Sequence, residues 1–325
     1  MALIHGKKLI IVFLLILETS TYQAMSRTLL EDSIVGRYQQ WMAKYGRNYK
    51  DDAEKEKRFE LFKVNVEYID KVNNEGNRTY KLSVNEFADL TTEEFIATRT
   101  GYKISSQPTS PKTSFKYENL TEIPMTMDWR EKELLPPSKT KARCCWAFSA
   151  VAAVEGVTQI KNGNKISLSE QQLVDCVEGS HGCNGGVMDY AFEYIIQNQG
   201  LATEENYPYQ AMDGTCDQQR ASNIVAQISS YEDVPSNNEE ALLQVANHPV
   251  SSYSSGVFTG ECGTNLDHAV TIIGYGMTDD GTKYWLIKNS WGTTWGESGY
   301  MRIQRDTGAL EGVCGIAMNP SYPVA

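Results

Sequence analysis

Cys145 is the residue of this sequence that is best placed to act as a nucleophile. It opens a run of alanine and apolar residues that continues through Ile160 and stops at Gly163. This composition predicts a buried helix, and a cysteine at a helix N-terminus is favoured as the thiolate. A thiolate nucleophile also needs a base beside it and a group that orients the base. The structural alternative for any single cysteine is a disulfide partner.

His268 is the candidate for that base. It stands just before a β-rich run at 269–275, and a second strand at 283–288 follows an Asp-Asp-Gly turn. A hairpin of this kind can bring His268 close to Asn289, which comes directly after the second strand and would orient the imidazole. The other histidines fall at the N-terminus or in loop-like stretches: His5, His181 and His248.

The number of cysteines is consistent with a free thiol among disulfides. The chain has seven cysteines, so at least one is left over if the rest pair, and all seven lie after residue 143. Zinc binding is the rival use of Cys and His, but no C-x2-C or H-x3-H spacing occurs in the sequence. We therefore predict no metal and no cofactor.

The elements that must position these residues belong to a globular protein. The 325 residues are 41% apolar and 22% charged, and the length allows two or three folding units. The net charge is −11, whereas nucleic-acid-binding domains are usually basic, so we expect no nucleic-acid partner. The part before Ile123 is close to neutral and has no cysteine, and the part from Ile123 on carries the acidic excess.

The N-terminus is typical of a secretory signal peptide. Lys7-Lys8 precede nine apolar residues, Leu9–Leu17, and a polar stretch that ends at Ala24. Nine apolar residues are about half of a bilayer span, and no later stretch approaches the required length. We predict a signal peptide at 1–24 and a mature form with no membrane segment.

Entry into the secretory pathway permits disulfides and N-glycosylation. Two sequons fit that route, Asn77-Arg78-Thr79 and Asn119-Leu120-Thr121, so we expect modification at Asn77 and Asn119. A third candidate, Asn319-Pro320-Ser321, is excluded by its proline.

The front segment has a helical pattern from residue 35 to 74, and a short helix is predicted to start at the capping box Thr91-Thr92-Glu93-Glu94. Within the longer stretch, six residues keep to one broad helical stripe, so that polar and apolar anchors share a face. They are Glu54, Arg58, Phe62, Asn65, Ile69 and Asn73.

This stripe resembles the inhibitory propeptide of papain-like cysteine proteases. Asn85-x-Phe87-x-Asp89 is similar to the family's second propeptide motif, with Ser83 where glycine is usual. The nearest relatives that we recognise are plant senescence-associated cysteine proteases. The resemblance implies an inhibitory propeptide domain at 37–94, which runs through the enzyme's cleft in the reverse direction, and a linker at 95–122 that is removed on activation.

Segments of the back half resemble the catalytic segments of the same family: 145–149, 267–269 and 288–296. The resemblance implies a peptidase domain at 123–325. Its fold class would be α+β, a papain-like two-lobe fold with a helical lobe and a β-barrel-like lobe, preceded by the small helical propeptide domain.

The roles of the catalytic residues also come from the resemblance. It implies that Cys145 attacks the scissile carbonyl and that His268 forms the ion pair and protonates the leaving amine. Asn289 would fix the imidazole, and Trp291 would shield the pair from water. The family pairs the other cysteines as Cys144–Cys183, Cys176–Cys216 and Cys262–Cys314.

Substrate-binding positions are implied in the same way: Asn184, Gly185, Gly186, Val187, Met188, Leu266, Asp267, Ala269 and Trp291. Four of these residues would line the main specificity pocket, and all four are apolar: Val187, Met188, Leu266 and Ala269. We therefore expect a bulky apolar residue two positions before the scissile bond.

The sequence departs from the family's pattern at two places. The residues that usually separate the two cysteines before the helix are absent, so Cys144 adjoins Cys145, and Lys141 stands where a glutamine completes the oxyanion hole. After Val250 about eleven residues are absent, including a core strand, and Ser251-Ser252 lead directly into the next strand.

Three interpretations remain open. The first is a cysteine endopeptidase made as an inhibited precursor. The second is a catalytically impaired or inactive papain-like scaffold that binds peptides or inhibits proteases. The third is an ordinary enzyme whose two departures come from misassigned exon boundaries.

The expected partners are protein and peptide substrates, the chain's own propeptide and cystatin-type inhibitors, and we expect a monomer. The expected destination is a vacuole or lysosome-like compartment, with extracellular release as the alternative.

Overall fold

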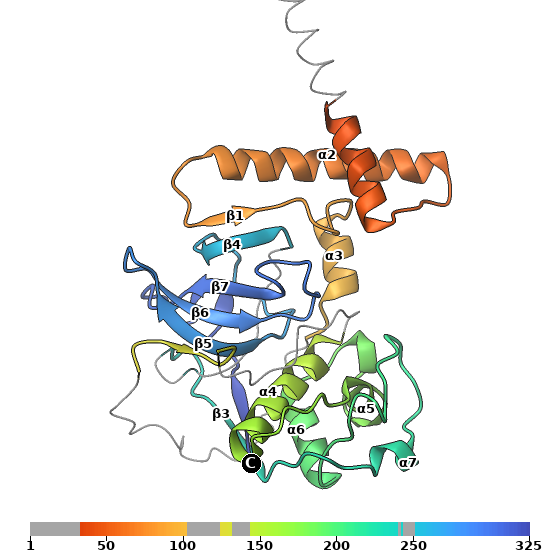
Figure 1. Ribbon diagram of the computed structural model, residues 1–325, viewed down its shortest axis with the longest axis vertical. Coiled ribbons are helices and arrows are strands. Elements are labelled where there is room, and N and C mark those ends of the chain that lie inside the picture. The colour runs from red at the N-terminus through yellow and green to blue at the C-terminus, as the bar shows by residue number, and fades with distance from the viewer. Residues whose placement is uncertain (1–32, 103–123, 132–143, 240–241, 243–250) are drawn as a thin grey trace, which may run out of the picture. The chain divides into compact units, whose positions relative to one another are not determined.

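The computed structural model describes residues 33–102, 124–131, 144–239, 242 and 251–325 (Figure 1). The chain forms two compact units, one up to Glu67 and one from Tyr68 to the C-terminus. Several predicted features lie outside the described residues: the signal peptide at 1–24, His5, Asn119, most of the linker at 95–122, Lys141, His248 and Val250.

The first unit is built around aromatic side chains on two helices. One helix covers residues 33–45, and the other, α2 (Asp52–Asn74), contributes its first part. The ring centroid of Tyr38 lies 5.8 Å from that of Trp41 and 5.1 Å from that of Phe62, distances at which aromatic rings attract one another. The predicted helical pattern is confirmed, with a break between the two helices.

The remainder of the predicted propeptide packs within the second unit. It includes the end of α2, the strand β1 (Tyr80–Leu82) and the helix α3 (Thr92–Arg99). The predicted capping box is confirmed, because the Thr91 side chain accepts from the Glu94 backbone N–H while the Glu94 side chain accepts from the Thr91 backbone N–H. The predicted linker at 95–122 therefore begins inside α3.

The main sheet of the second unit has six strands in the order β1-β4-β7-β6-β5-β2. The β4–β7 pair is parallel and the other pairs are antiparallel. The predicted hairpin is confirmed as β5 and β6, and β3 and β8 form a separate two-stranded sheet. The strands are β2 (Met127–Asp128), β3 (Ser230–Asp233), β4 (Tyr253–Phe258), β5 (Thr271–Met277), β6 (Lys283–Lys288), β7 (Tyr300–Gln304) and β8 (Ser321–Val324).

The helices after residue 143 gather on one side of the second unit, and the strands of the main sheet lie on the other (Figure 1). The first of them confirms the predicted buried helix and ends at Gly163, whose φ of 71° suits glycine. Their bounds are α4 (Cys145–Asn162), α5 (Glu170–Cys176), α6 (Met188–Gln197) and α7 (Gln218–Ala221), with short 3-10 helices η1 (Gly182–Asn184) and η2 (Val313–Gly315).

Two hydrophobic cores support this arrangement. One lies among the helices and includes Trp146, Phe192 and Leu201. The other lies behind the main sheet and combines side chains of the strands, such as Tyr253 and Trp285, with side chains of the propeptide. Burial of apolar surface is the main favourable term in folding, so the propeptide segment stabilises the sheet side of the unit.

The second departure from the family's pattern, the absence of about eleven residues after Val250, lies just before Ser251 and β4. The Ser251 carbonyl accepts hydrogen bonds from the Asn85 side chain at 2.6 Å and from the Trp295 indole at 3.0 Å, and the Ser252 carbonyl accepts from the Ser83 N–H at 2.9 Å. The strand that follows is paired on both sides, with β1 and with β7. In this precursor β4 therefore has a hydrogen-bonded neighbouring strand on each side, although the segment before it is short.

The contact between β1 and β4 requires glycine at position 256. Its φ is +90°, and a Cβ there would meet the Thr79 carbonyl oxygen at 2.2 Å. Gly281 has a similar φ of +86° but nothing within 4 Å of its Cβ position.

We predict that Gly256→Ala destabilises the full-length chain more than Gly281→Ala does. Both substitutions carry the cost of a left-handed φ, about 1–3 kcal/mol, and the clash with β1 adds about 1–3 kcal/mol at position 256. Urea unfolding of the two variants measures the difference. Equal losses would contradict the close approach of β1 to β4.

Candidate active site

Cys145 is the first residue of α4 and is fully buried. Its neighbour Cys144 forms a disulfide with Cys183, with the two Cα atoms 4.4 Å apart, and the Trp146 indole donates to the Gly182 carbonyl at 2.9 Å. These two links hold the start of α4 against η1. The adjacent cysteines thus have different states, one bonded across to η1 and one free.

The structure joins the remaining cysteines as Cys176–Cys216 and Cys262–Cys314. All seven cysteines lie in the described part of the chain, and Cys145 is the free one among them. Both bridges close loops, of 40 and 52 residues in sequence separation, and thereby restrict the unfolded chain.

The hydrogen bonds of Asn289 fix the tautomer of His268. The backbone N–H of Ser290 donates to Asn289 Oδ1 at 2.7 Å, which identifies this atom as the oxygen of the amide. His268 Nε2 lies 2.9 Å from the same oxygen. Because a carbonyl oxygen can only accept, Nε2 carries the proton, and Nδ1 is the basic nitrogen of the neutral ring.

Trp291 covers this pair. Its ring stacks on the His268 ring with centroids 4.7 Å apart and an interplanar angle of 20°. Phe95 of the propeptide meets the Trp291 indole edge-on, with ring centroids 4.9 Å apart. His268 and Asn289 are 1% and 4% exposed, so their hydrogen bond is shielded from water.

Contacts one helical turn further along α4 bring the thiol and the imidazole to the same place. Ser149 Oγ donates to the Val270 carbonyl at 2.8 Å, and Thr271 Oγ1 donates to the Ser149 carbonyl at 3.4 Å. Ser149 lies about one turn after Cys145, and Val270 lies two residues after His268. The start of α4 therefore faces the start of β5.

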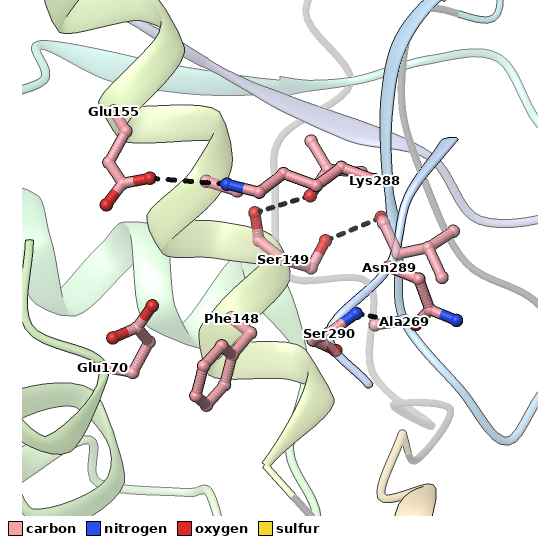
Figure 2. Close-up of a pocket in the computed structure, with 11 residues that line it drawn as sticks. Phe148, Ser149, Glu155, Glu170, Ala269, Lys288, Asn289 and Ser290 are labelled. Carbon is pink, nitrogen blue, oxygen red and sulfur yellow. Dashed lines mark hydrogen bonds and ion pairs between the residues drawn. The ribbon is translucent and has the colours of Figure 1, made fainter. Parts of the chain in front are cut away.

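A buried polar cluster lies behind this contact (Figure 2). Lys288 reaches across from β6 to Glu155 of α4, with its Nζ 3.9 Å from Glu155 Oε2, and both side chains are almost fully buried. Glu155 Oε1 also accepts from the Leu168 N–H at 3.0 Å. Glu155 and Lys288 line a cavity of ≈ 20 Å³, which is room for about one water molecule. Since Lys288 immediately precedes Asn289, this ion pair holds the end of β6.

The predicted substrate-binding backbone is occupied by the chain itself. Gly186 N–H donates to the Gly101 carbonyl at 3.1 Å, and Tyr102 forms a parallel bridge with Gly186. The N–H groups of Gly101 and Tyr102 both donate to the Asp267 carbonyl, at 3.1 and 2.9 Å. Glycine is required at 186 because a Cβ would meet the Trp146 ring at 2.6 Å. Burial raises the pKa of the Asp267 carboxyl to about 6.

The four apolar residues of the predicted pocket belong to the same buried cluster as Tyr102, which is 5% exposed. They are Val187, Met188, Leu266 and Ala269. Sequence reasoning missed Asn319, whose side-chain amide donates to the Tyr102 hydroxyl. The sequence considered Asn319 only as an excluded glycosylation site, and nothing in its local pattern points to this pocket.

Two other predicted substrate-binding residues, Gly185 and Asn184, form hydrogen bonds within the protein. Gly185 N–H bonds the Gly182 carbonyl, and the Gly185 carbonyl accepts from His181 N–H, so this residue closes the η1 turn. The exposed Asn184 side chain donates to Asp213 Oδ2 at 3.1 Å, and the Cys183 N–H donates to Asp213 Oδ1 at 2.6 Å. Asp213 thus braces this segment, a role that the sequence did not indicate.

Within the described ranges, no group of three or more His, Cys, Asp or Glu side chains is arranged to hold a metal ion. None of the helices in the described part of the chain has both the length and the apolarity needed to cross a bilayer.

Two family models match the chain. Residues 123–324 match the papain family cysteine protease model, and residues 38–95 match the cathepsin propeptide inhibitor domain.

The chain is also similar to curated plant proteins over most of its length. It is 52% identical to the senescence-specific cysteine protease SAG39 of Oryza sativa subsp. indica, covering 92% of this chain and 93% of the relative. It is likewise 52% identical to the senescence-specific cysteine protease SAG12 of Arabidopsis thaliana, covering 88% of this chain and 89% of that one.

Solved structures show the same likeness in three dimensions. A recombinant stem bromelain precursor matches with a TM-score of 0.84 and 42% identity over 90% of this chain and 99% of that chain. A bromelain protease from Ananas comosus, in complex with the inhibitor E64, matches with a TM-score of 0.59 and 43% identity over 62% of this chain and 99% of that chain.

We predict that Glu155→Gln destabilises the full-length chain by about 3–5 kcal/mol, because it leaves the buried Lys288 ammonium without its counter-charge. The double variant Glu155→Gln/Lys288→Met should recover most of this loss, since no buried charge then remains. Urea unfolding measures both.

Asp306→Asn is the control, because it breaks surface ion pairs of Asp306 Oδ2 with Lys283 Nζ of β6 at 2.7 Å and with Arg305 Nη1 at 3.0 Å. Exposed pairs contribute about 0–1 kcal/mol. A loss at Glu155 no larger than this control would contradict a stabilising ion pair behind Asn289.

Proposed function

The chain belongs to the papain family of cysteine proteases, and we propose that it is an endopeptidase that uses Cys145, His268 and Asn289. It is made as a precursor that its own propeptide inhibits. The observation that carries this proposal is the free thiol at the N-terminus of α4, facing a histidine whose tautomer an asparagine fixes. The fold of a papain-like precursor is in keeping with it.

The first half of the reaction forms an acyl-enzyme. The Cys145 thiol gives its proton to His268 Nδ1, and the thiolate attacks the carbonyl carbon of the scissile peptide bond. The C–N bond then breaks, and the leaving amine takes the proton from Nδ1. Throughout, Nε2–H stays on Asn289 Oδ1, so the ring keeps its orientation while its charge changes.

The second half regenerates the enzyme. A water molecule gives a proton to Nδ1 and attacks the acyl carbon, the C–S bond breaks, and the acid product leaves. The negative oxygen of each tetrahedral intermediate needs donors. The N–H of Cys145 is one, because the first N–H groups of a helix have no partner within it. Lys141, at the usual place of the second donor, lies outside the described residues.

Inhibition follows from the hydrogen bonds of Gly101 and Tyr102. They use the Gly186 N–H and the Asp267 carbonyl, groups that an extended substrate would otherwise bind. The bridge to Gly186 is parallel. A segment in this direction occupies the site without presenting a peptide bond as substrate does.

The remaining features of the proposal concern processing and destination. A signal peptide at 1–24 directs the chain into the secretory pathway, and activation removes the residues up to about 122. Asn77, which is exposed, and Asn119 carry glycans. The mature monomer acts in a vacuole or lysosome-like compartment or outside the cell, on proteins and peptides, and cystatin-type inhibitors bind it.

We predict that E64, the inhibitor in the bromelain complex, labels Cys145 in the processed protein. The labelled residue is identified by mass spectrometry after full-length precursor has been converted at acid pH. Cys145→Ala should abolish labelling and peptide hydrolysis together, whereas Cys144 stays unlabelled because it is bonded to Cys183.

A folded, processed protein that neither takes the label nor hydrolyses peptides would contradict the proposal. It would favour the inactive scaffold, in which the lack of the oxyanion glutamine or of the segment after Val250 has ended turnover. Sequencing the transcript across codons 135–150 and 245–260 separates this outcome from misassigned exon boundaries.

We predict that Asn289→Ala lowers kcat/KM about 10- to 150-fold. A hydrogen bond to a charged group contributes about 1.5–3 kcal/mol, and this variant leaves the imidazolium without its acceptor. Asn162→Ala, an exposed asparagine at the end of α4, is the control and should change nothing. Unchanged turnover in a folded Asn289→Ala variant would remove the orienting role.

A further inference from the structure

The boundary between the two compact units does not lie where the propeptide ends. The second unit begins at Tyr68, within the predicted propeptide domain at 37–94, and runs to the C-terminus. The propeptide residues from 68 on therefore belong to the same compact unit as the enzyme. We call residues 68–90, from the end of α2 to the chain just before α3, the core segment.

The core segment supplies one edge of the main sheet. Its strand β1 is the edge strand, and it lies beside β4 (Figure 1). The Val257 N–H donates to the Thr79 carbonyl at 2.9 Å, and the Thr79 hydroxyl donates to the Val257 carbonyl at 2.6 Å. On its other side β4 pairs with β7, where Val257 and Phe258 lie opposite Arg302 and Ile303. Loss of the core segment would therefore leave β4 as an unpaired edge.

The core segment also completes a hydrophobic core of the sheet side. Five of its side chains, none more than 6% exposed, pack in one cluster with side chains of β4, β6 and β7: Ile69, Val72, Tyr80, Leu82 and Phe87. The ring centroid of Tyr80 lies 4.8 Å from that of Phe258. Removal of the segment would expose the apolar partners of these side chains to water, which is unfavourable. The sequence lacks about eleven residues, including an expected core strand, just before the same strand β4.

The residues that block the active site are a different part of the propeptide. Gly101 and Tyr102 form the hydrogen bonds to Gly186 and Asp267, and they follow α3. This helix has eight residues, and most of its side chains are exposed, whereas Phe95 is buried. A helix of this length is marginal without packing. The chain can therefore be cut between the core segment and the blocking residues.

We infer that the core segment stays in the mature enzyme as a second, noncovalently bound chain, and that activation expels only the residues that block the site. The inference rests on the proposed function and changes one part of it, because hydrolysis before about residue 122 would separate the propeptide from the protease chain without removing all of it. The docking surface is β4 with the core behind it. Its partner is the chain's own core segment, which binds by adding a strand to the sheet.

The first experiment determines the composition of the active enzyme. Full-length precursor is converted at acid pH, labelled with E64 and passed through a gel-filtration column under native conditions, and mass spectrometry identifies the chains in the labelled fraction. We expect an equimolar fragment that contains residues 68–90. Labelled, folded enzyme that consists of the chain from about residue 123 on alone overturns the inference.

The second experiment does not depend on turnover. In the full-length chain with Cys145→Ala, recognition sequences for a site-specific protease are placed after Leu90 and after Gln107, and the chain is cut at both. Gel filtration then shows which pieces stay with the protease chain. We expect the piece that ends at Leu90 to stay and the piece 91–107 to leave. Urea unfolding before the cut checks that the insertions leave the fold intact.

Two neighbouring positions on β1 provide matched variants of the doubly cut chain. Leu82 is buried in the cluster, whereas Lys81 is exposed. Leu82→Ala should raise the dissociation constant of the piece that ends at Leu90 about 30-fold or more, because it truncates a buried leucine. Lys81→Ala should change this constant little. Serial dilution followed by gel filtration measures both.

The outcomes separate the two proposals. An active enzyme without the core segment overturns the inference and leaves the proposed function intact. If the protein neither hydrolyses peptides nor takes E64, the proposed function fails, and the doubly cut chain alone decides the inference. Retention of the piece that ends at Leu90, weakened by Leu82→Ala and not by Lys81→Ala, supports it. Release of that piece, or equal effects of the two substitutions, overturns it.

Discussion

The function of this protein depends on the packing of one helix end against one strand end. Cys145 and His268 are 123 positions apart in sequence and lie on α4 and just before β5. Ser149 joins the two elements by hydrogen bonds to Val270 and from Thr271, and all three residues are buried. A displacement of this contact would separate thiol from imidazole, because the two residues belong to different elements that meet here.

The side chains that support this contact are polar. Burying polar groups costs free energy unless each group is paired. The Glu155–Lys288 pair links α4 to the end of β6, and Asn289 follows directly. The hydrogen bond from Ser290 N–H then sets the orientation of the Asn289 amide, and this amide sets the tautomer of His268. The buried Glu155–Lys288 pair, the Asn289 amide and His268 Nε2 thus form one connected series of fixed polar groups.

The propeptide uses the same features that the enzyme needs. Its strand β1 extends the sheet along β4, its Phe95 packs on the tryptophan that stacks on His268, and its Tyr102 packs in the cluster that contains the apolar residues of the predicted pocket. Because the segment before β4 is short, hydrogen bonds from Asn85 and Ser83 satisfy the carbonyls there. The propeptide therefore packs against the same residues that we propose for catalysis and substrate binding.

The sequence by itself determined the local features. The alanine-rich helix after Cys145, the capping box at Thr91, the hairpin of β5 and β6 and the glycine that ends α4 follow from patterns within about twenty residues. The odd number of cysteines indicated a free thiol. The resemblance to papain-like proteases, carried by short motifs, supplied the candidate catalytic residues and the pairing of the cysteines.

The tertiary structure decided what depends on residues far apart in the chain. The hydrogen bond between Asn319 and Tyr102 joins positions separated by 217 residues, and neither position has a local pattern that distinguishes it. Periodicity and spacing report on neighbours along the chain, whereas a pocket's chemistry comes from side chains that only the packed fold brings together.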